Sequence, residues 1–178
     1  MPLGTPARRM PIPEEVSDFL ADLLGASIAA EKVSKSQKLP DAEDCVTAIY
    51  VEDDGRLGGA CVADLSFAAS AGAALAMMPK AIVEEATRKG ELIESLHENY
   101  YEVVNILTAL LAGPSVPHLR LDRLEVGIPD EVQQMYDEAA GKRQYAVSII
   151  GYPGGKMALM AASPAKTAAK AVRPAARR

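Results

Sequence analysis

The stretch Glu91-Leu-Ile-Glu-Ser-Leu-His-Glu-Asn-Tyr-Tyr-Glu-Val-Val-Asn-Ile-Leu-Thr-Ala-Leu-Leu111 predicts one long amphipathic helix. Large apolar side chains recur at steps of three and four residues and would form one buried stripe: Leu92, Leu96, Tyr100, Val103, Leu107 and Leu111. The opposite side carries Glu91, Glu94, Glu98, Glu102 and Asn105 at the same spacing. Like charges at this spacing repel by roughly 0.2–0.5 kcal/mol per pair. The acidic line is therefore either a solvated surface or a surface offered to a basic partner.

The residues before this helix predict a β-hairpin with one helix before it and two shorter helices after it. Pro13, followed by two glutamates, suits a helix that begins there and runs to about Val33. Residues 45–52 and 57–65 are rich in β-branched and apolar side chains and flank an Asp-Gly pair, which is typical of a hairpin turn. Two shorter helices are expected over residues 67–78 and 80–89.

The residues after the central helix predict further strands. Residues 118–126 alternate apolar and charged side chains, and 144–152 with 156–162 suit a closing hairpin around Tyr-Pro-Gly-Gly. Residues 129–141 are expected to form a loop with a turn or two of helix. The element order predicts an α+β fold in which long helices pack on one face of a largely antiparallel sheet.

Composition divides the chain into three parts. Residues 1–12 are proline-rich and predict an irregular N-terminal arm, residues 13–162 a single domain, and residues 163–178 a disordered tail rich in Ala, Lys, Arg and Pro. The tail carries a charge of +5 with no acidic residue, which leaves the remainder of this 178-residue chain near −10. An acidic body favours basic partners, so nucleic acid is an unexpected ligand except through the tail.

The remaining composition argues against several classes of site. Cys45 and Cys61 are the only cysteines, and they predict small buried side chains rather than a disulfide framework or a cysteine metal site. The two histidines, His97 and His118, cannot be combined into metal-ligand spacing or a catalytic triad. No segment is apolar and long enough to span a bilayer, and residues 1–13 do not form a secretory signal. We therefore expect a cytoplasmic protein.

The element order, together with Glu102-x-x-Asn105 on a helix that follows the small-residue segment ending Leu75-Ala-Met-Met, resembles the CheC/CheX/FliY family of bacterial chemotaxis phosphatases. The resemblance covers roughly residues 14–162 and is closest to CheX-like members with one motif. The family signature is Asp or Ser, three residues, Glu, two residues, Asn. Here Glu98 stands where Asp or Ser is usual, and the Gly that often follows the Asn is absent. A second motif is incomplete, because Gly25 stands at its Asn position.

The resemblance implies a CheC-like fold, binding to receiver domains of response regulators in two-component signalling, and hydrolysis of their aspartyl phosphate. Glu102 would pair with a lysine of the receiver, Asn105 would orient the attacking water, and Glu98 would contact the partner. The receiver would supply the Mg²⁺, so no cofactor or metal is expected in this chain. The resemblance also implies a homodimer.

Two alternatives to a phosphatase remain open at this stage. A non-catalytic adaptor or sensory module of the same fold would use the same surface to bind a partner without hydrolysis. Association with nucleic acid would instead depend on residues 163–178.

Overall fold

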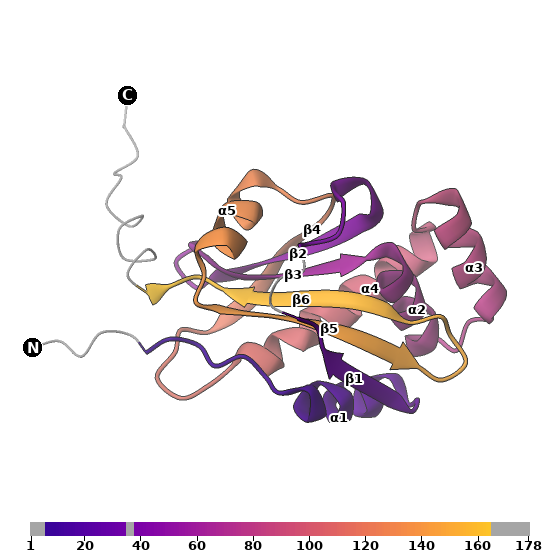
Figure 1. Ribbon diagram of the computed structural model, residues 1–178, viewed down its shortest axis with the longest axis horizontal. Coiled ribbons are helices and arrows are strands. Elements are labelled where there is room, and N and C mark those ends of the chain that lie inside the picture. Colours follow the sequence, from indigo (N-terminus) through magenta and orange to yellow (C-terminus); the bar gives the residue numbers. More distant parts are fainter. Residues whose placement is uncertain (1–5, 35–37, 165–178) are drawn as a thin grey trace, which may run out of the picture.

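A six-stranded sheet with the strand order β1-β5-β6-β3-β2-β4 organises the molecule, and every neighbouring pair is antiparallel (Figure 1). The computed structural model describes residues 6–34 and 38–164. The strands are β1 (Ile28–Lys32), β2 (Cys45–Glu52), β3 (Leu57–Asp64), β4 (Leu119–Val126), β5 (Gly141–Ile149) and β6 (Gly155–Ala161). The helices are α1 (Pro13–Leu24), α2 (Leu65–Leu75), α3 (Lys80–Lys89), α4 (Glu94–Leu107) and α5 (Asp130–Glu138), with 3₁₀ turns η1 (Ala42–Asp44) and η2 (Thr108–Leu111).

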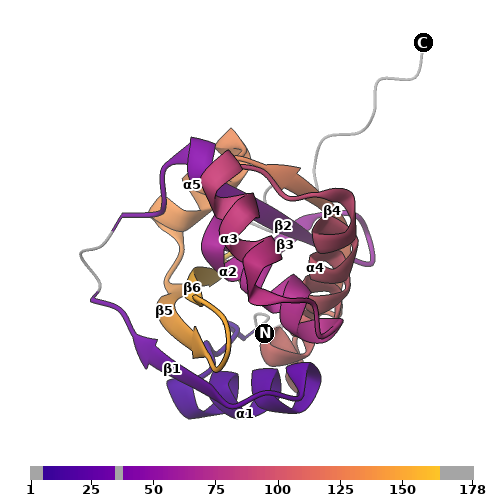
Figure 2. The same ribbon diagram turned by 90° about the vertical axis from the view of Figure 1, so that its right-hand side faces the viewer.

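The long helices α1, α2 and α4 pack on one face of the sheet, and the shorter α5 lies on the other (Figures 1 and 2). The main core joins the apolar stripes of the three long helices to inward side chains of β2, β3, β5 and β6. A smaller core forms where Val132, Met135 and Ala139 contact the opposite face. The α+β class with long helices on one face is confirmed.

The central strand β2 shows why both faces need a cover. Val46, Ala48 and Tyr50 point into the main core, whereas Cys45 and Ile49 point into the core under α5. All eight residues of the strand are buried. A strand buried on both faces reads as an almost continuous apolar run, which is how residues 45–51 appear in the sequence.

The first helix is shorter than predicted. It ends at Leu24, because Gly25 adopts a left-handed conformation (φ +61°) and its N–H closes the helix on the Ala21 carbonyl. The residues expected to continue the helix instead form β1, which pairs with β5 from Ile28↔Ile149 to Lys32↔Tyr145. The prediction of a helix to Val33 was wrong because the apolar spacing continues past the glycine to Ile28.

The boundaries of two other segments also differ from the prediction. The central helix begins at Glu94 rather than Glu91, and its last turn tightens into η2. Residues 129–141 contain α5, a nine-residue helix, where the sequence indicated a loop with a turn or two. Pro129 precedes this helix, and Asp130 and Glu131 occupy its first turn, where acidic side chains favour the positive end of the helix dipole.

The N-terminal segment has no regular secondary structure over residues 6–12, yet it is anchored to the domain. Arg8 is buried and donates hydrogen bonds to the main-chain carbonyls of Leu111, at 3.0 Å, and Pro117. Met10 packs into the main core. The predicted disorder of the basic tail concerns residues 163–178, of which residues 165–178 lie outside the described residues.

Candidate functional site

The helix α4 separates its side chains into a buried stripe and an exposed line. Leu96, Tyr100, Val103 and Leu107 are buried, as is Val104 beside them. The line Glu94, Glu98, Glu102 and Asn105 is exposed to solvent along the opposite side. The structure therefore presents Glu98, Glu102 and Asn105 together on one helix face, while Glu91 precedes the helix and does not belong to that line.

Two neighbours hold α4 firmly against the domain. The helices α2 and α4 cross at Gly72, where an added Cβ would lie 2.8 Å from the Leu96 carbonyl oxygen. At the other end, the buried Tyr50 hydroxyl of β2 donates a hydrogen bond to the Val104 carbonyl at 2.8 Å. This carbonyl belongs to the last turn of α4, where main-chain acceptors lose their partners within the helix. The exposed line is thus carried by a helix that is fixed at both ends.

The acidic side chains of α4 lack the partners that acids have on the adjacent helix. On α3, Lys80 pairs with Glu84 at 3.3 Å, and Lys89 pairs with Glu85 at 2.7 Å. The α4 sequence contains no lysine or arginine. Within the described part of the chain, neither Glu98 nor Glu102 forms an ion pair. The line therefore carries negative charge that no cation of the described chain balances.

Asn105 has a different chemistry from its acidic neighbours. Its main-chain carbonyl accepts a hydrogen bond from the Thr108 hydroxyl at 2.8 Å. Its exposed side-chain amide has no hydrogen-bond partner among the described residues, so both the donor and the acceptor are free to meet another molecule. Asn is less favourable than Ala or Gln in a helix interior, and nothing within α4 compensates for it.

Two partly exposed hydrophobic side chains flank the polar line. Tyr101 is 39% exposed and Ile106 is 38% exposed, and helical geometry places them on opposite sides of Glu98, Glu102 and Asn105. A polar centre with apolar neighbours on both sides is a suitable surface for a protein partner.

Other candidate groups take structural positions. The Asp64 carboxylate begins α2, where it accepts the Phe67 N–H at 2.7 Å, and its burial raises its pKa. His118 lies exposed beside Asp53, at 3.5 Å from Nδ1 to Oδ1. Burial raises the pKa of the Cys45 thiol to about 11 and that of the Cys61 thiol to about 12, so neither is activated as a nucleophile.

No group of three or more His, Cys, Asp or Glu side chains in residues 6–34 and 38–164 is arranged to hold a metal ion. Over the same residues, none of the helices has both the length and the apolar character needed to cross a membrane.

A basic cleft at the end of β1 was missed by sequence reasoning. Its charged side chains come from the N-terminal segment, from β1 and from β5, which are far apart in the chain. Lys32 and Arg143 do not belong to a common sequence motif, and they come together only because β1 pairs with β5.

The fold and the exposed line together define a class of protein: an α+β domain that presents to solvent an acidic helix with an exposed asparagine, Asn105. No protein-family model matches the sequence, and a search of curated proteins found no significant match. Solved structures do match. A chain in the crystal structure of the FliM–SpeE complex from H. pylori superposes with a TM-score of 0.58 at 10% identity, covering 91% of each chain.

Two further structures are similar at lower scores. The FliM middle domain from Vibrio alginolyticus has a TM-score of 0.50 at 7% identity, covering 90% of this chain and 92% of that one. A chain in the CheX–CheY–BeF₃–Mg²⁺ complex from Borrelia burgdorferi has a TM-score of 0.45 at 12% identity, covering 84% and 94%. The chain therefore has the CheC/CheX/FliY-type fold, as the sequence indicated, and the first two similarities carry this conclusion.

Proposed function

We propose that this protein binds receiver domains of response regulators through the exposed face of α4 and hydrolyses their aspartyl phosphate. The observation that carries the proposal is the exposed, unpaired set Glu98, Glu102 and Asn105 on one rigid helix of a CheC/CheX/FliY-type fold.

The proposed chemistry needs little more than positioning. An aspartyl phosphate is an acyl phosphate and is already reactive, so hydrolysis mainly requires a water molecule held in line with the phosphorus. The Asn105 amide oxygen can accept a hydrogen bond from that water, and its NH₂ group can donate one to a phosphoryl oxygen, without any change in protonation. The receiver supplies the Mg²⁺ that neutralises the phosphoryl charge, so the chain contributes orientation rather than a metal.

The spacing of the three side chains suits one partner site. Glu102 and Asn105 lie about 4.5 Å apart along the helix axis, and Glu98 lies about 10 Å from Asn105, at about 1.5 Å rise per residue. Glu102 is therefore close enough to pair with a receiver lysine while Asn105 reaches the phosphoryl group. Tyr101 and Ile106 then provide apolar contacts on each side of the polar centre.

The decisive experiment follows acyl phosphate decay in a receiver domain phosphorylated with acetyl phosphate. A CheY domain and the receivers encoded beside this gene form the substrate panel. We expect the wild-type chain to accelerate decay of at least one receiver, and Asn105→Ala to lose about 100-fold of that acceleration, as expected for loss of water positioning. Glu102→Ala is expected to weaken receiver binding. Glu91→Ala is the matched control, because Glu91 is exposed just before this helix but does not belong to the exposed line.

The result also separates catalysis from simple binding. Equal decay with wild type and Asn105→Ala would remove this side chain from the mechanism. Receiver binding that depends on Glu102, without accelerated decay of any receiver, would identify the second candidate function, a non-catalytic adaptor. The departure at Glu98, where the family motif has Asp or Ser, favours that second candidate.

A further inference from the structure

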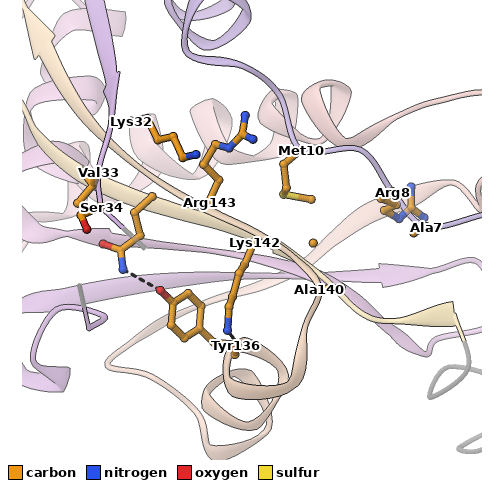
Figure 3. Close-up of a pocket in the computed structure, with 12 residues that line it drawn as sticks. Ala7, Arg8, Met10, Lys32, Val33, Ser34, Tyr136, Ala140, Lys142 and Arg143 are labelled. Atoms are coloured by element: carbon orange, nitrogen blue, oxygen red, sulfur yellow. Dashed lines mark hydrogen bonds between the residues drawn. The ribbon is translucent and has the colours of Figure 1, made fainter. Parts of the chain in front are cut away.

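The basic cleft lies at the edge of the sheet where β5 extends beyond its neighbour β1 (Figure 3). The last residue of β1, Lys32, pairs with Tyr145, and only the Val33 N–H, which bonds to the Gln144 carbonyl, continues the ladder. The first residues of β5 therefore have no strand on this side. The N-terminal segment and the end of α5 flank the gap and enclose a volume of about 450 Å³, which is within the usual range for small-molecule sites.

The charge of the cleft is opposite to that of the body. Arg8, Lys32, Lys142 and Arg143 line it, and none of the described residues that line it is acidic. The chain outside the C-terminal tail has a charge near −10. Four cations without a carboxylate among them therefore form a local reversal of the sign of the surface charge. Such a reversal attracts anions to this one place on an otherwise acidic surface.

Two of the four cations are already engaged. The Arg8 guanidinium is held by the Leu111 and Pro117 carbonyls and lies 4.0 Å from Glu52. The Lys142 ammonium donates to the Tyr136 carbonyl and lies 4.6 Å from the centre of the Tyr136 ring. These two side chains therefore form part of the cleft wall, and they contribute less than the other two to binding an anion.

The other two cations remain available for a ligand. The Lys32 side chain is exposed and has no hydrogen bond or ion pair to the described part of the chain. Arg143 donates Nη1 to the Pro11 carbonyl at 3.1 Å, which leaves further N–H donors on its guanidinium. On α1, Glu15 is itself paired with Arg9 at 2.5 Å.

Strand geometry brings Lys32 and Arg143 to the same side of the sheet. Lys32 stands opposite Tyr145, and Arg143 lies two residues before Tyr145 on the same face of β5. They are therefore diagonal neighbours, about 7–8 Å apart at their Cα atoms. Figure 3 shows both side chains at one end of the cleft, with Lys142 and Tyr136 at the other. An anionic group between Lys32 and Arg143 would relieve their mutual repulsion.

The edge of β5 adds a main-chain contribution. The Gln144 carbonyl faces β1, and alternate residues of a strand direct their main-chain groups to the same side. The N–H and carbonyl of Lys142 consequently face the uncovered edge, between the cationic end and the Tyr136 ring.

We propose that this cleft binds a small organic anion. Its phosphate or carboxylate group would lie between Lys32 and Arg143, and its flat or apolar body would extend along the β5 edge toward Tyr136. This site is separate from the exposed line of α4 and does not depend on the phosphatase proposal.

Isothermal titration of the full chain at low ionic strength tests the proposal with AMP and benzoate as the anionic probes and adenosine as the uncharged control. We expect saturable one-site binding of at least one anion and none of adenosine. Binding of AMP alone would assign the phosphate source, and binding of benzoate alone the carboxylate source. Absence of saturable binding of both anions would overturn the proposal.

Variants tie the binding to the cleft. Lys32→Glu is expected to weaken binding at least ten-fold without loss of the fold, because the Lys32 side chain makes no hydrogen bond within the described chain. Lys32→Gln with Arg143→Gln gives a second, charge-removing test. The control is Arg120→Gln, an exposed cation on β4 at the opposite edge of the sheet. Equal weakening in Arg120→Gln and Lys32→Glu, or unchanged binding in Lys32→Glu, would refute the site.

Discussion

Gly72 sets the distance between α2 and the helix that carries the candidate site, and Gly72→Ala tests that contact. The added Cβ would lie 2.8 Å from the Leu96 carbonyl oxygen and 3.3 Å from the Tyr100 nitrogen. Ordinary contact begins near 3.4 Å, so the two helices must separate by about 0.6 Å at the crossing. Main-chain atoms of a packed helix cannot move aside as a flexible side chain can.

Two opposing terms determine the size of the effect. Overpacking of this kind costs about 1–3 kcal/mol. Replacement of a helical glycine by alanine returns about 0.5–1 kcal/mol through backbone entropy. The middle of each range gives a net loss in the free energy of unfolding of about 1 kcal/mol, which corresponds to a Tm about 2–4 °C lower for a domain of this size.

Thermal unfolding followed by circular dichroism measures this change. Gly113→Ala is the control, because its added Cβ meets only the Val116 side chain, at 3.6 Å, and we expect a change within about 0.5 kcal/mol. If Gly72→Ala melts at the wild-type temperature or above, helix propensity has prevailed, and α2 and α4 do not cross in main-chain contact.

Two further predictions concern buried groups. Tyr50→Phe removes the donor from the Val104 carbonyl and is expected to lower the free energy of unfolding in urea by about 1–3 kcal/mol, and a loss below about 0.5 kcal/mol would show that water replaces this donor. The thiols of Cys45 and Cys61, with pKa values raised to about 11 and about 12, should not react with DTNB at pH 8 until the protein unfolds. Because burial raises both pKa values above the ordinary 9.0, the stability that the two protonated thiols contribute is complete below about pH 9 and is lost as the pH rises toward 11–12. The urea midpoint of unfolding should therefore fall over that pH range, and it should fall less in Cys61→Ala.

The sequence was most informative where periodicity and burial agree. The buried stripe and the exposed line of α4 follow from steps of three and four residues, and the exposure of Glu98, Glu102 and Asn105 agrees with that pattern. Their proposed roles remain predictions, because exposure alone does not distinguish a solvated surface from a binding surface. The hairpin of β2 and β3 was also predictable, since Asp54-Gly55 lies between two apolar runs.

The errors arise where tertiary contacts override local preference. The segment Ile28-Ala-Ala suits a helix by composition, but pairing with β5 makes it a strand. Gly25 was the available signal that the helix ends, and its left-handed conformation is now evident. The basic cleft had no local signal at all, because it depends on which strand pairs with β5.

The position of β6 has a consequence for folding. Among the described residues this strand is the last in sequence order, yet it lies inside the sheet between β5 and β3. It alone joins the pair β1-β5 to the group β3-β2-β4. During synthesis, the two parts of the sheet must wait for residues 155–161 to emerge from the ribosome before they can associate. Such dependence on distant segments favours slow folding, and a truncation that removes β6 is expected to prevent folding of the whole domain.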